Sequence, residues 1–173
     1  MQKSPFTIED LRSGNSVAWS SLYDWLAPDL RSFITRAGSA DPDDILGETM
    51  LQLVRDLPRF TDDADALRPW AFRIARNRVI DAARRKDRRP VEVTMSDEDS
   101  LPVEVRSDGT VDMDRLRRAL DTLNPEQRQI LWLRYAVDMS VAETARAMST
   151  TEDAVTASTM RALRRLRQGR DID

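Results

Sequence analysis

Apolar residues recur at three- and four-residue intervals along most of this chain, and this helical period constrains its fold more than any other feature. Period-two alternation is not convincing anywhere, and the Asp-Gly pair at 108–109 has polar flanks instead of apolar strands. The segment 41–57 is typical, because Asp41 and Pro42 mark a helix start and an apolar stripe follows at Leu46, Met50, Leu53 and Leu57. The pattern predicts an all-α protein.

The same pattern predicts the other helices and their ends. Residues 15–37 carry apolar side chains near helical spacing, and Pro28 leaves open whether they form one helix or a pair. Gly38 is suited to end this segment. Helices are also expected at 67–89, from about 114, from 124, at 140–148 after a capping box of Ser140 and Glu143, and at 152–168, the last two joined by a tight turn at 149–151.

Charge is distributed in blocks, although the formal net charge of the 173-residue chain is only −3. Residues 70–90 hold eight arginines or lysines against two acids, whereas residues 91–114 hold eight acids against one arginine. Residues 90–113 also contain two prolines and a glycine, which is typical of a linker. We therefore expect two small helical domains, at 1–90 and 114–173, joined by an acidic flexible linker at 91–113 that lets them move relative to each other.

The composition excludes several classes of protein. Histidine and cysteine are both missing, which removes disulfides, thiolate zinc sites and the commonest general base. No run of about 18 apolar residues would span a membrane, and the N-terminal residues lack an apolar signal core. We expect a cytoplasmic, non-catalytic protein with no cofactor, no metal, no membrane insertion and no small-molecule substrate.

The stretch "RPWAFRIARNRVIDAARRKDRRP" at 68–90 combines aromatic residues with a dense set of arginines. Phe72, Ala75, Val79 and Ala82 share one face, so core packing is the favoured reading of Phe72. Trp70 is open to two readings, because an aromatic ring beside arginines also makes a stacking platform for unpaired bases. A membrane-surface helix is a further reading. The alanine-rich apolar face and the arginines bunched at one end favour nucleic acid.

Residues 140–168 have the order of a helix-turn-helix, with a short helix, a tight turn and a longer helix that ends in arginines. The second helix of such a motif lies in the major groove of DNA, where small polar residues reach base edges and arginines neutralise phosphates. A plain helical hairpin with a solvated basic face fits the pattern about equally well.

The acidic run "DPDDILGETM" allows one catalytic alternative. Asp43, Asp44 and Glu48 could hold Mg²⁺ together with a substrate phosphate, as in an all-α phosphohydrolase. A helix start favoured by the helix dipole explains the same acids. No matching carboxylate pair is found on another predicted helix, so we favour the helix start.

Taken together, these segments closely resemble the extracytoplasmic-function (ECF) sigma factors of bacterial RNA polymerase over about residues 15–90 and 114–168. "DDILGETMLQLVRDLPRF" is similar to the family's polymerase-binding helix, and "RPWAFRIARNRVIDAARRKDRR" resembles its "W-L-F-x-I-A-R-N-x-x-I-D-x-x-R-R" helix. "ALDTLNPEQRQILWLRYAVDMSVAETARAMSTTEDAVTASTMRALRRLR" follows the order of its second domain almost throughout. Both halves occur in the right order and at the right separation.

The resemblance implies a function that the pattern alone could not give. The first domain would bind core RNA polymerase at the β′ clamp helices and melt the promoter −10 element, with the loop 60–66 near a flipped-out base. The second domain would read the −35 element and meet the β flap, and an anti-sigma factor would hold the protein inactive. Implied polymerase-binding residues are Asp43, Asp44, Leu46, Glu48, Thr49 and Met50. Implied −10 residues are Trp70, Arg73, Arg76, Asn77, Arg84, Arg85 and Arg88, and implied −35 residues are Thr151, Thr156, Ser158, Thr159, Met160, Arg161, Arg164 and Arg165.

The sequence also departs from the family's pattern. Gly47 replaces the usual Gln of the polymerase-binding helix, and Met50 replaces an aromatic residue. In the reading helix, Thr156, Ser158 and Met160 stand where the family often has Lys, Arg and His, and Asp153 replaces a glycine. Because two cations are missing from the expected DNA face, we predict weaker phosphate attraction and an atypical −35 sequence.

Three hypotheses therefore compete. The first is a promoter-specificity subunit of the ECF type with no catalysis of its own. The second is a stand-alone helix-turn-helix regulator, which leaves the first ninety residues unexplained. The third is the Mg²⁺-dependent phosphohydrolase centred on Asp44 and Glu48.

Overall fold

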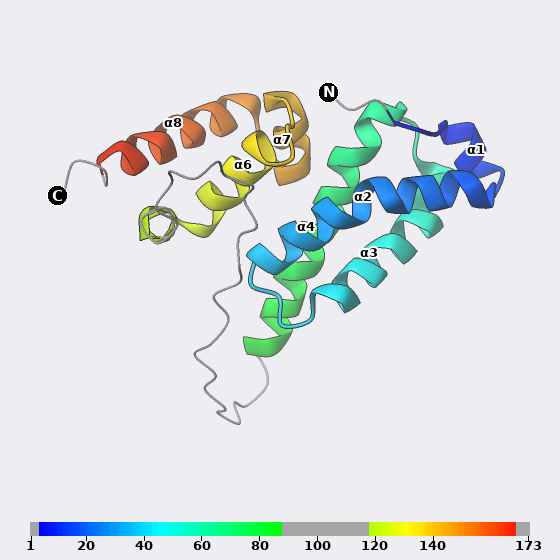
Figure 1. Ribbon diagram of the computed structural model, residues 1–173, viewed down its shortest axis with the longest axis horizontal. Helices are drawn as coiled ribbons and strands as arrows, with labels where there is room; N and C mark the ends of the chain where they lie inside the picture. The colour runs from blue at the N-terminus through cyan, green and yellow to red at the C-terminus, as the bar shows by residue number, and fades with distance from the viewer. Residues whose placement is uncertain (1–3, 88–117, 169–173) are drawn as a thin grey trace, which may run out of the picture.

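The computed structural model of the chain describes residues 4–87 and 118–168, and every regular element in these two ranges is helical (Figure 1). The predicted linker at 91–113 and Arg88 lie outside the described residues. The first half contains α1 (Ile8–Arg12), α2 (Ser16–Arg36), α3 (Pro42–Asp56), the 3-10 turn η1 (Leu57–Arg59) and α4 (Ala64–Asp87). The second half contains helical residues at 118–121 followed by α6 (Pro125–Tyr135), α7 (Val141–Met148) and α8 (Glu152–Gln168).

In the first half, α2, α3 and α4 pack against one another, and α1 covers one end of α2. Their shared core is built from side chains that are removed from solvent almost completely, among them Leu26, Phe33, Leu53 and Phe72. The rings of Phe33 and Phe72 meet edge to face with centroids 5.4 Å apart. The sequence-based prediction that Phe72 packs in the core is confirmed.

Capping residues fix the helix starts that the sequence predicted. The Asp41 carboxylate accepts a hydrogen bond from the backbone N–H of Asp44 at 3.0 Å at the start of α3. Ser140 and Glu143 form a reciprocal capping box at the start of α7. Asn124 does the same with Gln127 at the start of α6. Each bond satisfies an otherwise orphaned backbone donor, which is why these local signals are readable from the sequence.

The structure settles one local feature that the sequence left open and differs from the sequence-based expectations in two others. Helix α2 continues through Pro28 as one helix, which settles the alternative of a helix pair. Helix α4 begins at Ala64 instead of Leu67, because the Asp63 carboxylate accepts a hydrogen bond from the N–H of Ala66 at 3.0 Å. The five-residue α1 was not predicted, and it is tied down by Trp19, whose indole N–H donates to the carbonyl of Leu11 at 3.0 Å.

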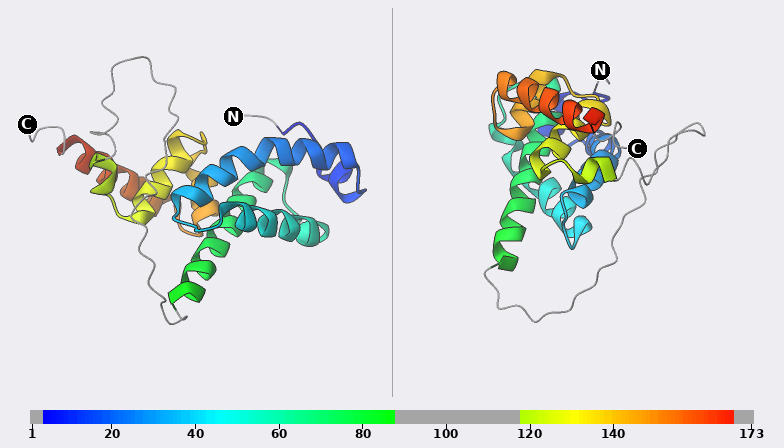
Figure 2. Two further views of the ribbon diagram at one scale, coloured as in Figure 1. Left: turned by 60° about the horizontal axis from the view of Figure 1, so that its bottom comes forward. Right: turned by 90° about the vertical axis from the view of Figure 1, so that its left-hand side faces the viewer.

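The two halves pack against each other through α4 and α7, and α2 also contacts α6 (Figures 1 and 2). A single apolar cluster contains Phe72 of α4 together with Ala145 and Met148 of α7. The Arg36 guanidinium lies over the Trp132 ring of α6, 4.1 Å from the ring centroid. This arrangement differs from the expectation that the domains move freely, because apolar side chains of both halves are buried in the same cluster.

Candidate nucleic-acid and protein interfaces

Most of the α3 residues that the resemblance assigned to polymerase binding are buried or bonded to other residues of the protein. Leu46 and Thr49 are buried, with Thr49 fully removed from solvent and its hydroxyl donating to the carbonyl of Ile45 at 2.7 Å. Met50 is half-buried against the core. Only Asp43 and Asp44 of the six are exposed. Leu46 and Thr49 therefore do not form a contact surface here, because their side chains point into the bundle.

Glu48 takes part in a hydrogen-bond network that joins α3 to α4. Arg78 donates to a carboxylate oxygen of Glu48 at 3.0 Å and to the side-chain carbonyl of Gln52 at 2.9 and 3.1 Å. These side chains are partly buried, so the bonds are less screened than those of a surface pair. The network positions α4 on α3, and it leaves Glu48 poorly placed to ligate a metal ion.

Asp43 is paired with Arg31 of α2 through two hydrogen bonds, at 2.7 and 3.1 Å. The hydrogen bond lowers the pKa of the Asp43 carboxyl and raises the pKa of Arg31. Both side chains are well exposed, so solvent screens the pair and its contribution to stability is small. Within the described residues no group of three acidic side chains is arranged to hold a metal ion.

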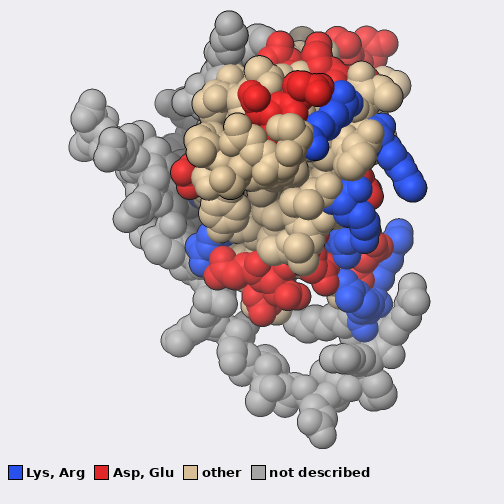
Figure 3. All heavy atoms as spheres, turned by 90° about the vertical axis from the view of Figure 1, so that its right-hand side faces the viewer, with Lys and Arg blue, Asp and Glu red and all other residues tan. Residues whose placement is uncertain are grey.

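Helix α3 presents a different exposed strip, which the sequence-based assignment missed. Leu51 is 71% exposed and Val54 is 50% exposed, and they follow Asp44 and Gly47 along one side of the helix. A signal for them was available, because both lie outside the apolar stripe of Leu46, Leu53 and Leu57. Figure 3 looks onto the end of the first half at which α1 lies, where uncharged side chains gather between groups of acids. Contiguous exposed apolar side chains beside acids are typical of a protein-binding surface.

Helix α4 carries arginines on its outer side and an aromatic pair near its start. Arg73, Asn77, Arg84 and Arg85 are exposed, as the resemblance required of strand-binding residues. Trp70 is only half-exposed and is stacked on Phe60, with ring centroids 4.7 Å apart and an angle of 24° between the planes. Arg76 is half-buried, and its Nε atom has no hydrogen-bond partner.

A cavity of about 320 Å³ lies between the aromatic pair and the second half of the protein. Phe60, Asp62, Trp70 and Arg73 line it from the first half, and Arg146 of α7 lines it from the second. A neighbouring hollow joins Arg73 to the turn between α7 and α8. The face of α4 that carries Trp70 and Arg73 is therefore shared with α7 in this structure.

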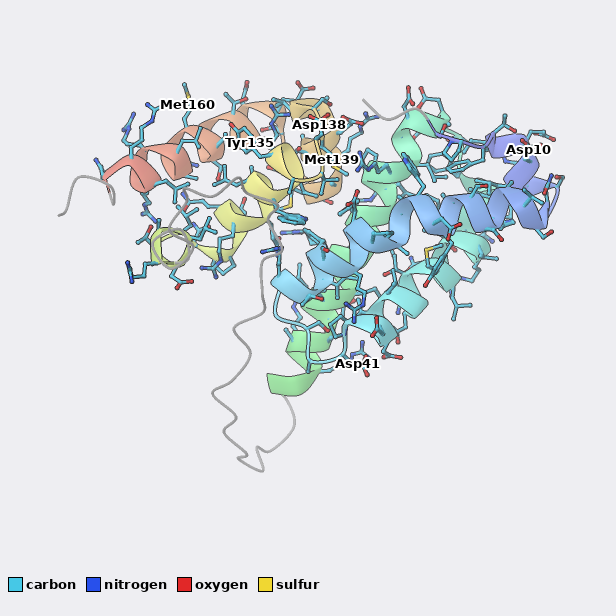
Figure 4. All side chains as sticks on the ribbon, in the orientation of Figure 1. Asp10, Asp41, Tyr135, Asp138, Met139 and Met160 are labelled. Carbon is cyan, nitrogen blue, oxygen red and sulfur yellow. The ribbon has the colours of Figure 1, made fainter. Side chains whose placement is uncertain are left out.

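Helices α6, α7 and α8 pack together as a helix-turn-helix, with Ser149 at a φ of 54° ending α7. Val155, Ser158 and Ala162 face inward. Thr156, Met160, Arg161 and Arg164 are exposed. Figure 4 shows Met160 projecting from the outer side of α8, away from α6. The outer side of α8 is thus free of the other helices.

Three of the assigned α8 residues are engaged within the protein. Ser158 is only 6% exposed because it lies on the side of α8 that packs on its neighbours, so this structure does not present it on the outer side of the helix. The Thr159 hydroxyl donates to the carbonyl of Val155 at 2.8 Å. The Arg165 guanidinium donates to the carbonyl of Thr122 at 3.4 Å, although the Arg165 side chain remains exposed. Thr151 is exposed and caps α8 by accepting from the N–H of Ala154 at 3.2 Å.

Two family profiles match the chain and define its class. The profile described as Sigma-70 region 2 matches residues 22–89, which contain most of α2 together with α3 and α4. The profile described as Sigma-70, region 4 matches residues 113–166, which contain α6, α7 and nearly all of α8. The protein is therefore of the sigma-70 type, with both regions in one chain.

Curated relatives narrow the class. The chain is 33% identical to the ECF RNA polymerase sigma factor BldN of Streptomyces coelicolor, over 92% of this chain and 62% of that relative. It is 32% identical to ShbA of Streptomyces griseus, over 72% of this chain and 69% of that relative. It is 36% identical to SigM of Mycobacterium tuberculosis, over 77% of this chain and 66% of that relative. The chain belongs to the ECF sigma factors. It spans only about 61–62% of the length of the first curated relatives that it matches.

Solved structures share the fold. The sigma factor RpoE in complex with the anti-sigma factor NepR, from Bartonella quintana, matches with a TM-score of 0.69 and 22% identity, over 89% of this chain and 97% of that chain. CnrH in complex with the cytosolic domain of CnrY matches with a TM-score of 0.66 and 22% identity, over 96% of each chain. At this identity the likeness establishes the fold alone.

Proposed function

We propose that this protein is a promoter-specificity subunit that binds core RNA polymerase and directs transcription initiation at its own set of promoters. The first domain, 1–90, binds the β′ clamp helices and holds the non-template strand of the −10 element. The second domain, 114–173, reads the −35 element with α8 and meets the β flap. The acidic linker, 91–113, connects the two domains through the core enzyme.

One observation carries the proposal. A single chain holds an exposed acidic and apolar strip on α3, an arginine-lined helix α4 and a helix-turn-helix whose outer α8 side is free. Arginines with an aromatic residue suit single-strand capture, and a free helix ending in arginines suits the major groove. The strip on α3 supplies the protein-binding surface that such a subunit needs in order to reach polymerase.

Partners and location follow from this function. We expect the protein to work in the cytoplasm, without catalysis of its own, and to be held inactive by an anti-sigma factor that covers its polymerase-binding surfaces. The complexes of RpoE with NepR and of CnrH with the cytosolic domain of CnrY support an anti-sigma partner. None of the described helices has both the length and the hydropathy needed to cross a membrane.

The first test is binding of the purified protein to bacterial core RNA polymerase by gel filtration. We expect co-elution for the wild type and binding weakened about tenfold or more for Asp44→Arg, because charge reversal on an exposed acid disturbs the proposed contact surface without touching the core. Arg118→Glu, an exposed reversal in the second half, serves as a matched control for charge reversal.

Failure of this experiment has a clear meaning. If the full chain does not bind core polymerase and yet binds duplex DNA by itself, the protein is a stand-alone helix-turn-helix regulator. If Asp44→Arg binds as tightly as the wild type, the strip on α3 is not the polymerase-binding surface.

A further inference from the structure

The outer side of α8 has an unusual composition for a DNA-reading helix. Asp153, Thr156, Met160 and Arg164 are spaced at three, four and four residues, so they lie on one side of the helix, and all four are exposed. Val155 and Ala162 are fully buried on the opposite side. Among the side chains of this strip, the first cation is Arg164, near the end of the helix.

This composition limits which bases the strip can read. Guanine is read most often by bidentate contacts from Arg or Lys, and the first two turns of α8 carry none on their outer side. Thr156 is short, and Asp153 repels phosphate. The long side chain in the middle of the strip is Met160, which is 65% exposed. An apolar side chain in the major groove distinguishes thymine by its 5-methyl group.

We propose that Met160 determines −35 specificity by packing against the 5-methyl group of a thymine. This inference rests on the proposed function, because it requires α8 to lie in the major groove of the −35 element. The flexible thioether of methionine adapts to a methyl surface, and burial of Met160 removes a large exposed apolar side chain from water. Arg161 and Arg164 lie nearby on α8, where they can hold the phosphates that position the helix.

The test replaces each −35 thymine of a promoter by deoxyuridine, one at a time, which removes only the 5-methyl group. The holoenzyme made with the wild-type chain is expected to lose about threefold to fivefold in promoter affinity at one position, the effect of burying one methyl-sized group. The holoenzyme made with Met160→Ala is expected to bind the thymine and deoxyuridine promoters equally. Met160→Leu is expected to retain most of the preference for thymine. Val17→Ala, which changes an apolar side chain of similar exposure on α2, is the matched control and should keep the preference.

The outcomes separate this inference from the proposed function. If the holoenzyme binds the promoter and no thymine-to-uracil change matters, the inference is wrong and the proposed function stands. A preference that survives in Met160→Ala also overturns it. If Met160→Ala leaves promoter reading unchanged and weakens binding to a protein partner, the strip is a protein-docking face. Absence of any promoter binding by the holoenzyme would instead overturn the proposed function.

A second inference comes from an independent observation, the packing of α7 on α4. Arg146 of α7 lines the cavity beside Trp70 and Arg73, which are the residues proposed to hold the −10 strand. Trp70 is stacked on Phe60, so one face of its ring is not open to a base. Because α7 packs on α4 beside these side chains, it narrows the space that a single strand would need along this part of α4.

We infer that the free chain is held in a closed state in which α7 of its second domain packs beside Trp70 and Arg73 and restricts access to the start of the strand-binding face of the first. The cation–π contact of Arg36 with Trp132 joins α2 to α6, and neither side chain is among the buried core residues, so Arg36→Ala removes this contact without opening the core. Burial lowers the pKa of Arg36, although an arginine remains cationic in neutral solution. This inference also rests on the proposed function, because it is about access to the −10 strand.

The test uses fluorescence energy transfer between dyes on Asp24→Cys and Glu126→Cys, two exposed positions in different halves of a chain without native cysteine. We expect one high-transfer population in the free protein and a shift to low transfer on binding core polymerase. Arg36→Ala should enlarge the open population and raise the affinity of the free chain for a −10 single strand about threefold to tenfold.

Each arm has an outcome that contradicts the closed state. A broad low-transfer distribution in the free wild type would mean that the halves do not hold each other. An Arg36→Ala protein that opens without gaining affinity for the single strand would mean that α7 does not block strand binding. If the open protein and the holoenzyme both fail to bind the −10 strand, the proposed function of α4 is wrong.

Discussion

Phe72→Ala is expected to lower the free energy of unfolding of the first half by about 3–5 kcal/mol, the usual cost of removing a fully buried phenylalanine. Phe72 is fully removed from solvent, and its ring meets that of Phe33 edge to face at 5.4 Å. The substitution removes both the transfer energy of the ring and an aromatic contact worth about 0.5–1.5 kcal/mol. It also leaves a cavity where α2 meets α4.

Urea denaturation followed by far-ultraviolet circular dichroism measures this change, with the slope of the transition checked for two-state behaviour. Phe72→Leu keeps an apolar side chain in the site and should cost much less. A loss of less than about 1 kcal/mol for Phe72→Ala would mean that Phe72 is not part of the central core. The proposed functions of α4 would then lack the rigid support that we assign to it.

Local signals account for the part of the fold that the sequence predicted. The starts of α3, α6 and α7 depend on hydrogen bonds between residues three positions apart, so the capping residues are visible in the sequence itself. The inward side of each of these helices likewise follows from its apolar stripe. These features do not depend on what the distant parts of the chain do.

Contacts between distant residues account for what the sequence did not predict. The Arg12 guanidinium donates to the carbonyl of Phe60, 48 residues away, and this bond helps to hold the short α1. Arg68 is paired with Asp29 at 2.7 Å across 39 residues. No spacing rule indicates such partners. The packing of α7 on α4 belongs to the same group, because an apolar face of α7 does not itself specify which helix covers it.

The residues of the candidate site likewise fall into those whose exposure agrees with the sequence-based assignment and those that the packing buries. Exposure of Arg73, Asn77, Met160 and Arg164 agrees with their assigned roles, which remain predictions. Thr49 and Ser158 were assigned by their place in a family motif, and the structure buries both. A motif position names a residue without saying which side of its helix is covered. That information came only from the packing of α3 and α8 on their neighbours.

Leu51→Arg is expected to weaken binding to core RNA polymerase by about thirtyfold or more, as truncation of a central interface residue typically does. Leu51 is 71% exposed and lies with Asp44 and Val54 on the strip of α3 that remains accessible. An arginine there places a charge in the middle of an apolar contact, whereas folding is little affected because Leu51 makes no part of the core. Titration of labelled protein with core polymerase measures the affinity.

Thr49→Val provides the matched control on the same helix. Its hydroxyl is buried and donates to the carbonyl of Ile45, so its loss should cost about 1 kcal/mol of stability and leave polymerase affinity unchanged. The two variants therefore distinguish the exposed strip from the family-derived residue set. Tight binding by Leu51→Arg together with loss of binding by Thr49→Val would show that α3 must rearrange to expose Thr49, and the strip of Asp44, Leu51 and Val54 would then not be the contact surface.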